Sequence, residues 1–149
     1  MNKLALDRPD WRIILIGPVQ SKCDFPSNVE LPGQVAHAKL AAWLIEADII
    51  LLPCVLHAYT DAVMPAKTYE VLASGLPIVA APLGELTERF SHVMHFTKSP
   101  AGWADAVERA LDQETPEKRA QRKILAEKNS WLARYDEFKV LLGNDKGND

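Results

Sequence analysis

Polar and apolar positions divide the chain into short apolar runs, rich in Ile and Val, and longer segments whose apolar residues recur at helical spacing. An uninterrupted apolar run bounded by turn residues is typical of a strand that is covered on both faces. We expect strands over residues 11–17, 28–33, 49–53, 76–82 and 93–97. We expect helices over residues 35–48, 65–74, 84–91 and 100–112. This alternation predicts an α/β fold in which helices flank a parallel sheet.

The final part of the chain has a different pattern, because apolar and aromatic residues stand three, four or seven positions apart on a strongly charged background. This spacing predicts a C-terminal helical segment over residues 113–142, either one long amphipathic helix or two in tandem. Its apolar stripe, expected to serve packing rather than ligand binding, consists of Ile124, Trp131, Tyr135, Phe138 and Leu142. We expect one domain over residues 1–143 and a disordered tail at 144–149.

Functional residues are expected at one edge of the sheet, because sites in parallel sheets lie beyond the carboxyl ends of the strands. The loops after Gly17, Gly33, Pro53 and Ala81 have this position. The loop after Pro53 leads directly into the segment PAKTYEVLASGLPIVAAP, residues 65–82. This segment is therefore the first place to look for a site.

Residues 65–74 have the start and stop signals of a helix. Pro65 suits the first turn, where its missing N–H is not needed, and Gly75 suits the end, where glycine adopts a left-handed conformation most easily. Lys67 and Glu70 are three residues apart in this helix. They are either a surface ion pair, or part of a site in which the helix start attracts a phosphate and Glu70 accepts hydrogen bonds from vicinal hydroxyls, such as those of a ribose. Spacing alone leaves both interpretations open.

Composition narrows the class of protein. Among the 149 residues, 17 are basic and 20 are acidic, and the net charge of −3 argues against a general nucleic-acid binder. The hydrophobic content of 48% is that of an ordinary globular protein, and the two cysteines are too few for a disulfide framework. The first residues, MNKLALDRPDW, lack the apolar region of a signal peptide. We therefore expect a cytoplasmic protein.

The segment MPAKTYEVLASGLPIVAAP resembles the donor-binding signature of the GT-B glycosyltransferases, specifically the C-terminal domain of the family 4-like group, also called glycosyl transferases group 1. The positions that match are Pro65, Lys67, Glu70, Ala73, Gly75, Pro77 and Val79. The flanking segments WRIILIGPV, NVELPGQV and LAAWLIEADIILLP resemble the same domain in the same order. The resemblance covers nearly the whole chain. It implies a Rossmann-like, nucleotide-sugar-binding domain that needs no metal and takes a UDP-, GDP- or dTDP-sugar as donor.

The resemblance also implies roles for residues at the start of the predicted helix. Glu70 would bind the ribose of the donor. Backbone amides around Val63, Met64 and Pro65 would meet the diphosphate or the sugar. Lys67 would add a positive charge there or remain a surface residue.

Other loops at the same edge would meet the base and the sugar. Gln34 and Val35 would lie near the base, and Gly17 ends the first strand beside them. Many members of the group carry an acidic residue eight positions before the glutamate, in contact with the sugar. Here that position is Ala62, with Asp61 beside it, which leaves the sugar contact open.

Two parts of the family's architecture have no counterpart in this sequence. GT-B enzymes bind the acceptor, and place their catalytic base, on a separate N-terminal domain. Their C-terminal domain also opens with a strand and a helix before the part that matches here. Without that strand, residues 11–17 are expected either to pair directly with residues 49–53 or to leave two strand edges open. We therefore expect a hexosyltransferase-type fragment that is a poor catalyst alone and needs an N-terminal acceptor domain on another chain, or self-association.

Other classes of function remain as alternatives. A non-catalytic nucleotide-binding or protein-interaction module would dock a partner on the C-terminal helical segment, and a nucleotide-sugar epimerase would have a similar fold. The basic residues Lys118, Arg119, Arg122 and Lys123 are expected on a solvated helix face, with contact to an anionic membrane as the weaker interpretation. Cys54 follows a predicted buried strand and is expected in the core.

The remaining histidines give weaker signals. His57 lies in the loop that enters the predicted site, either as an ordinary loop residue or in contact with a phosphate or sugar hydroxyl. His92 and His95 would point to opposite faces of a strand, and no cysteine or carboxylate cluster accompanies them, so we expect no metal site.

Overall fold

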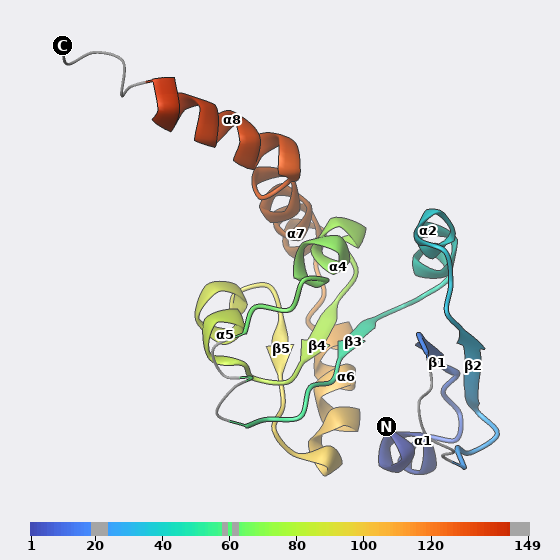
Figure 1. The fold of residues 1–149 in the computed structure, drawn as a ribbon. Helices are drawn as coiled ribbons and strands as arrows, with labels where there is room; N and C mark the ends of the chain where they lie inside the picture. Colours follow the sequence, from blue (N-terminus) through green and yellow to red (C-terminus); the bar gives the residue numbers. More distant parts are fainter. Residues whose placement is uncertain (19–23, 58–59, 61–62, 144–149) are drawn as a thin grey trace.

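Five parallel strands form two separate sheets in the part of the chain that the structure describes. The structure is a computed structural model and describes residues 1–18, 24–57, 60 and 63–143. The strands are β1 (Ile13–Ile16), β2 (Val29–Gly33), β3 (Ile50–Leu52), β4 (Ile78–Ala80) and β5 (His95–Phe96). β1 pairs with β2, and the other three pair in the order β3-β4-β5 (Figure 1). The fold is therefore α/β with parallel sheets, as predicted.

Pairing in each sheet is in register over short stretches. Ile13 lies opposite Val29 in the first sheet, and Ile50 lies opposite Ile78 in the second. Within the described residues no strand pairing joins β1 to β3. Of the two arrangements expected for these strands, the structure has the one that leaves two edges open.

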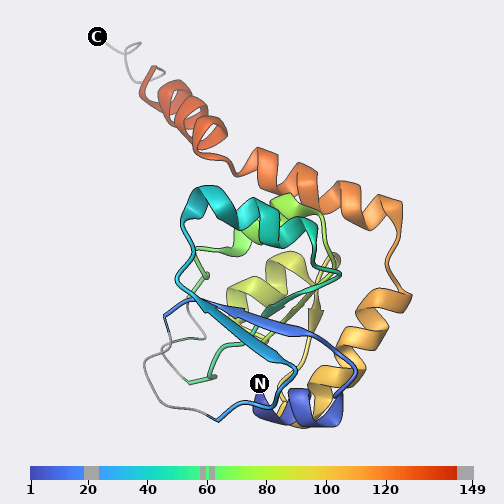
Figure 2. The same cartoon turned by 90° about the vertical axis from the view of Figure 1, so that its right-hand side faces the viewer.

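The helices cover the strands on two sides. Their bounds are α1 (Asn2–Asp7), α2 (His37–Ile45), α4 (Thr68–Ser74), α5 (Gly84–Phe90), α6 (Trp103–Asp112), α7 (Pro116–Lys128) and α8 (Trp131–Gly143). A short 3-10 turn, η1 (Pro100–Gly102), leads into α6. Figure 2 shows α2, α4 and α7 on one side of the strands and α1 and α6 on the other. No helix in the described ranges is long and apolar enough to cross a membrane.

β4 is the centre of the core because its side chains alternate between both faces of the sheet. Ile78 and Ala80 pack in a buried cluster with residues of α4, α5 and α7, and both are 0% exposed. Val79, also 0% exposed, packs instead with residues of α1 and α6. The short run IVA therefore has the double-sided burial that its uninterrupted apolar sequence predicted.

Packing of α1 and hydrogen bonds from Asn28 hold the first sheet in place. Leu4 and Ala5 of α1 and Ile13 of β1 are buried in the same cluster as Val79. The Asn28 side chain donates hydrogen bonds to the carbonyl oxygens of Ala5, Arg8 and Trp11, at 3.1, 3.0 and 2.9 Å. This single amide therefore ties the turn between α1 and β1 to the start of β2.

The C-terminal segment consists of two helices in tandem, α7 and α8. Thr115 caps α7 by accepting a hydrogen bond from the Lys118 amide at 3.2 Å, and Pro116 takes the first helical position. α7 packs along α4, whereas α8 extends away from the strands (Figure 1). The prediction that the apolar stripe serves packing is wrong for α8 within this chain. Ile124 of the stripe is in α7 and the other four residues are in α8. All five are exposed: Ile124 48%, Trp131 92%, Tyr135 58%, Phe138 56% and Leu142 57%.

The start of α4 differs from its prediction, whereas its end agrees with it. The helix expected over 65–74 begins at Thr68, and Pro65 belongs to the turn before it, where its carbonyl accepts a hydrogen bond from the Thr68 amide at 2.9 Å. Gly75 ends the helix in the predicted left-handed conformation, with φ of 74°. The predicted tail at 144–149 lies outside the described residues.

Candidate functional site

Two glycines end the first pair of strands, and the structure brings them together. Gly17 follows β1 and donates its amide to the carbonyl oxygen of Gly33, the last residue of β2, at 3.0 Å. Their φ values are 143° and 76°, a region that glycine adopts readily and other residues do not. Among the described residues, chain neighbours aside, nothing lies within 4 Å of a Cβ added at either position. The backbone conformation is therefore the reason that favours glycine here.

The loop after β2 is short, so α2 begins close to the same edge of the strands. Gln34 is exposed and Val35 is half-buried. Ala36 takes the N-cap position with an extended backbone, and α2 starts at His37. Along α2, Leu40, Trp43 and Leu44 are half-buried, and no residue of the helix is fully buried. The two residues predicted to lie near a base are therefore accessible at a helix start.

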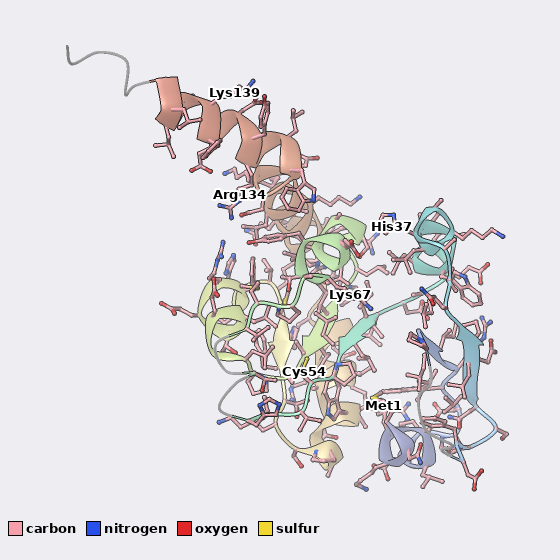
Figure 3. All side chains as sticks on the ribbon, viewed as in Figure 1. Met1, His37, Cys54, Lys67, Arg134 and Lys139 are labelled. Carbon is pink, nitrogen blue, oxygen red and sulfur yellow. The ribbon has the colours of Figure 1, made fainter. Side chains whose placement is uncertain are left out.

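Glu70 lies in the first turn of α4 and meets α2. His37 Nε2 is 3.5 Å from Glu70 Oε1, and the two side chains are 83% and 46% exposed. Figure 3 shows His37 on the side of α2 that faces α4. Nothing in the spacing of His37 from Glu70 along the sequence indicates a contact between α2 and α4. Its position directly after the predicted loop at 34–35 was the one usable signal.

Lys67 takes the N-cap position of α4 rather than a place in its first turn, and it is exposed (Figure 3). In the described ranges no ion pair joins Lys67 to Glu70, which contacts His37 instead. The surface ion pair that spacing allowed is therefore absent from this structure. Lys67 presents its charge beside the start of α4.

The segment before α4 offers fewer backbone donors than the sequence suggested. The Val63 amide already donates to the carbonyl oxygen of Thr60 at 3.2 Å, and Pro65 has no N–H. Among the described residues, the amides of Met64, Ala66 and Lys67 have no hydrogen-bond acceptor. Asp61 and Ala62, predicted to lie near a sugar, fall outside the described residues.

Arg122 of α7 holds the far end of α4 in place. Arg122 is 1% exposed, and its guanidinium donates to the Gly75 carbonyl from Nε at 3.1 Å and from Nη2 at 2.9 Å. It also donates to the Val93 carbonyl at 3.1 Å and pairs with Glu114. Arg122 was predicted on a solvated face, and that prediction is wrong. Its guanidinium supplies the donors that the carbonyl groups at the end of α4 and before β5 need.

Thr68, the first residue of α4, is fully buried, and its hydroxyl has no hydrogen-bond partner in the described part of the chain. A buried hydroxyl without a partner lowers stability, because it gives up its bonds to water on folding. The start of α4 is thus held by packing rather than by a side-chain cap.

The loop after β3 differs from its prediction at one position. Cys54 is exposed, not in the core, since the chain leaves the sheet at Leu52. His57 and Thr60 are hydrogen-bonded to each other: the His57 amide donates to Thr60 Oγ1 at 2.9 Å, and the Thr60 amide donates to His57 Nδ1 at 3.3 Å.

His95 in β5 lies on the other side of β4 from the candidate site. Partial burial lowers its pKa below 6.5, and the positive charges of Lys118, Arg109 and Arg122 lower it further. His92 lies in the turn before β5 rather than in the strand. Over the described ranges no group of three or more His, Cys, Asp or Glu residues is arranged to hold a metal ion.

Comparison with known proteins places this geometry in a family. The family described as glycosyl transferases group 1 matches residues 1–113, which include both sheets and the segment around Glu70. The chain belongs to this family, and the resemblance noted from sequence is confirmed. No solved structure matched the chain significantly.

One curated relative matches nearly the whole chain but is much longer than it. The chain is 25% identical over 157 residues to the putative teichuronic acid biosynthesis glycosyltransferase TuaH of Bacillus subtilis (strain 168). The match covers 98% of this chain and 40% of the relative. The chain therefore spans less than half the length of this glycosyltransferase.

Proposed function

We propose that this chain is the donor-binding part of a glycosyltransferase that moves a sugar from a nucleoside-diphosphate sugar to a sugar, lipid or cell-surface acceptor. The observation that carries the proposal is the family match over residues 1–113, within which Glu70 is exposed at the start of α4. A UDP-, GDP- or dTDP-sugar is the substrate class.

In the proposed complex, Glu70 accepts hydrogen bonds from the ribose hydroxyls. A carboxylate accepts through both oxygens, so it suits a vicinal diol. His37, which is 3.5 Å away, limits the positions that the carboxylate adopts. Gln34 and Val35, just before α2, lie close enough in sequence to His37 to border the base.

The diphosphate is proposed to lie against the segment before α4. The amides of Met64, Ala66 and Lys67 are its candidate donors, and the Lys67 ammonium adds a positive charge. Donors and cations that are already in place stabilise the charge that develops on a departing diphosphate, without a metal ion. Gly17 and Gly33, which are hydrogen-bonded to each other at the ends of β1 and β2, are proposed to border the same ligand.

The 149-residue chain alone is proposed to bind the donor but to transfer sugar poorly. The relative is a glycosyltransferase of which this chain covers 40%. Acceptor binding and a catalytic base would then come from residues outside this chain. A measurable rate of transfer from a nucleotide sugar by the purified chain would refute this part of the proposal.

Calorimetric titration with UDP, GDP and dTDP tests the donor site. We expect binding of at least one nucleotide, weakened about tenfold or more in Glu70→Ala, since hydrogen bonds to a charged group contribute about 1.5–3 kcal/mol. Glu88→Ala is a matched control, because Glu88 is exposed on α5, away from the site. Absence of binding by all three nucleotides would contradict the donor-site assignment.

The second candidate function is a non-catalytic interaction module. The exposed apolar stripe of α8 favours it, with Trp131 92% exposed. The same titration separates the two candidates, since an interaction module that lacks a donor site binds none of the nucleotides.

A further inference from the structure

One polar contact joins the starts of α2 and α4. His37 is the first residue of α2, Glu70 lies in the first turn of α4, and His37 Nε2 is 3.5 Å from Glu70 Oε1 (Figure 3). Within the described ranges no other ion pair or side-chain hydrogen bond links these two helices. Apolar packing between them is incomplete as well, because α2 has no fully buried residue. The pair is therefore a feature that the packing of the two helices does not explain.

The stability of α2 explains the pair only in part. Ala36, at the N-cap, has no side-chain oxygen, and the first turn of α2 contains no acidic residue. A carboxylate near a helix start is favourable, and Glu70 supplies one from a second helix. The side chains of His37 and Glu70 are nevertheless 83% and 46% exposed, and a pair as open as this contributes little to stability. Its atoms are accessible to a ligand.

Most of the hydrogen-bonding capacity of the pair is unused. An ionised carboxylate accepts through about four lone-pair positions on its two oxygens. In the described part of the chain, neither Glu70 Oε2 nor His37 Nδ1 has a partner. The contact between Nε2 and Oε1, at 3.5 Å, is also longer than an ordinary N–H···O hydrogen bond of about 2.7–3.2 Å. The imidazole is therefore not committed to the carboxylate.

A sugar hydroxyl needs both groups of this pair, because its O–H donates and its oxygen accepts. A carboxylate alone satisfies the O–H, and an imidazole N–H beside it satisfies the oxygen. The distances allow both bonds at once. A hydroxyl oxygen about 2.7 Å from Glu70 Oε1 and about 2.9 Å from His37 Nε2 closes a triangle with the 3.5 Å between those two atoms.

The position of His37 along the chain agrees with a sugar contact. β2 ends at Gly33 and α2 begins at His37, so the loop that contains Gln34 and Val35 directly precedes it. That loop is proposed to border the base, and Lys67 is proposed to meet the diphosphate. In a nucleotide the ribose lies between the base and the phosphates. A residue between the base-side loop and α4 is therefore placed beside the ribose.

Lys67 is the other cation near Glu70 in sequence, and it is a poorer donor for the same hydroxyl. It is exposed at the N-cap of α4, and within the described ranges it forms no ion pair with Glu70. Its ammonium is a point charge on a flexible four-carbon stem, whereas the His37 imidazole is rigid and already lies beside Oε1. The geometry favours His37.

We propose that His37 is a second sugar-contacting residue of the donor site. Its Nε2–H donates to the oxygen of the ribose hydroxyl whose O–H is accepted by Glu70 Oε1. The inference rests on the proposed donor function and adds one contact to it. The proton on Nε2 is present in one neutral tautomer and in the imidazolium, and among the described residues only Glu70 competes for it.

This contact distinguishes the two hydroxyls of the ribose. His37 has one Nε2–H and donates to one hydroxyl, whereas the two oxygens of Glu70 accept from both. Removal of the Glu70 carboxylate should therefore abolish the preference for both hydroxyls. Removal of the His37 imidazole should abolish the preference for one of them.

Calorimetric titration of the full chain with UDP and its 2′-deoxy and 3′-deoxy analogues tests the proposal, with the GDP series in their place if guanine binds better. We expect His37→Ala to weaken UDP binding about three- to tenfold, as for the loss of one hydrogen bond. The preference for one hydroxyl should be largely lost, and the preference for the other should stay within about twofold of that in the unaltered chain.

Three further variants separate a hydroxyl contact from other roles. His37→Gln keeps a side-chain N–H at a reach similar to that of Nε2, and it should restore UDP affinity to within about threefold. Lys67→Ala, in the part of the site proposed to meet the diphosphate, should weaken UDP and both analogues by a similar factor. His92→Ala is the matched control, because His92 is an exposed histidine in the turn before β5, and it should leave binding unchanged.

The results that would overturn the inference differ from failure of the donor site. One is UDP binding that requires Glu70 and is unchanged in His37→Ala. Another is a loss in His37→Ala that is equal for UDP and both analogues, which would mean that His37 acts on α2 or on Glu70 and touches no hydroxyl. A His37→Gln variant as weak as His37→Ala would also contradict the N–H contact. Absence of binding by every nucleotide would instead refute the donor site itself, and the inference with it.

Discussion

The imidazole Nε2 of His37 lies 3.5 Å from the carboxylate Oε1 of Glu70 and so joins the start of α2 to the first turn of α4. Both side chains remain largely exposed, and an exposed pair of this kind contributes little to stability. Its importance is in position. It brings the Glu70 carboxylate close to the start of α2, which directly follows the loop at Gln34.

Arg122 is predicted to be the most important charged residue for stability. Arg122→Met leaves the Gly75 and Val93 carbonyl groups and the Glu114 carboxylate without their donor. We expect a loss of about 3 kcal/mol in the free energy of unfolding, measured by urea denaturation. Arg119→Met is the matched control, because Arg119 is on the same helix with its side chain 55% exposed, and it should cost less than about 1 kcal/mol. Equal losses in the two variants would contradict this account.

Gly75 is predicted to be intolerant of alanine for two separable reasons. Its φ of 74° is unfavourable for alanine, and an added Cβ would lie 2.7 Å from Lys123 Cε. We expect Gly75→Ala to destabilise by about 1–2 kcal/mol. Repeating the substitution in a Lys123→Ala background removes this close contact and leaves the contact with Arg119 Cγ at 3.0 Å and the backbone term. Thermal unfolding of the unaltered chain and the three variants measures the difference, and no loss in either background would refute the explanation.

Thr68 and Thr115 are predicted to respond in opposite directions to the same substitution. Thr68→Val removes a buried hydroxyl that has no partner among the residues the structure describes, so stability is expected to stay equal or rise by about 1 kcal/mol. Thr115→Val removes the hydroxyl that caps α7 and is expected to cost about 1 kcal/mol. Urea denaturation of both variants checks the contrast. A clear loss in Thr68→Val would mean that its hydroxyl has a favourable contact.

His95 is predicted to make the protein less stable in mild acid. Burial and the charges of Lys118, Arg109 and Arg122 lower its pKa below 6.5, against one opposing carboxylate, Glu114. As the pH falls from above 6.5 through the lowered pKa, the unfolded chain binds the proton more readily, so stability is lost. Melting temperatures of His95→Gln should fall less steeply than those of the unaltered chain over this interval. His92→Gln, an exposed histidine in the preceding turn, controls for the loss of an imidazole, and a slope unchanged in His95→Gln would contradict the assignment.

Much of the fold could be predicted because its signals are local. The apolar runs around Ile13, Ile50 and Val79 identify strands without knowledge of their partners, and Gly75 identifies the end of a helix. The predicted start at Pro65 was three residues early, since a proline suits a turn before a helix as well as the helix itself.

The failures have a common physical cause, which is contact between distant residues. Arg122 stands among charged neighbours that resemble a solvated face, and its burial depends on carbonyl groups 47 and 29 residues away. The stripe of α8 has the spacing of a packed helix, but nothing in the described chain covers it. The contact of His37 with Glu70 likewise depends on how α2 and α4 meet, which periodicity does not specify.

The most direct test of the central claim, that Glu70 binds the ribose of a nucleotide, is a double comparison by calorimetry. UDP and its 2′,3′-dideoxy analogue, or the GDP pair if guanine binds better, are titrated into the unaltered chain and into Glu70→Ala. The account predicts that the unaltered chain prefers the nucleotide with both hydroxyls about tenfold or more, and that this preference falls to near one in the variant. An equal preference in both proteins would contradict the assignment of Glu70 to the ribose.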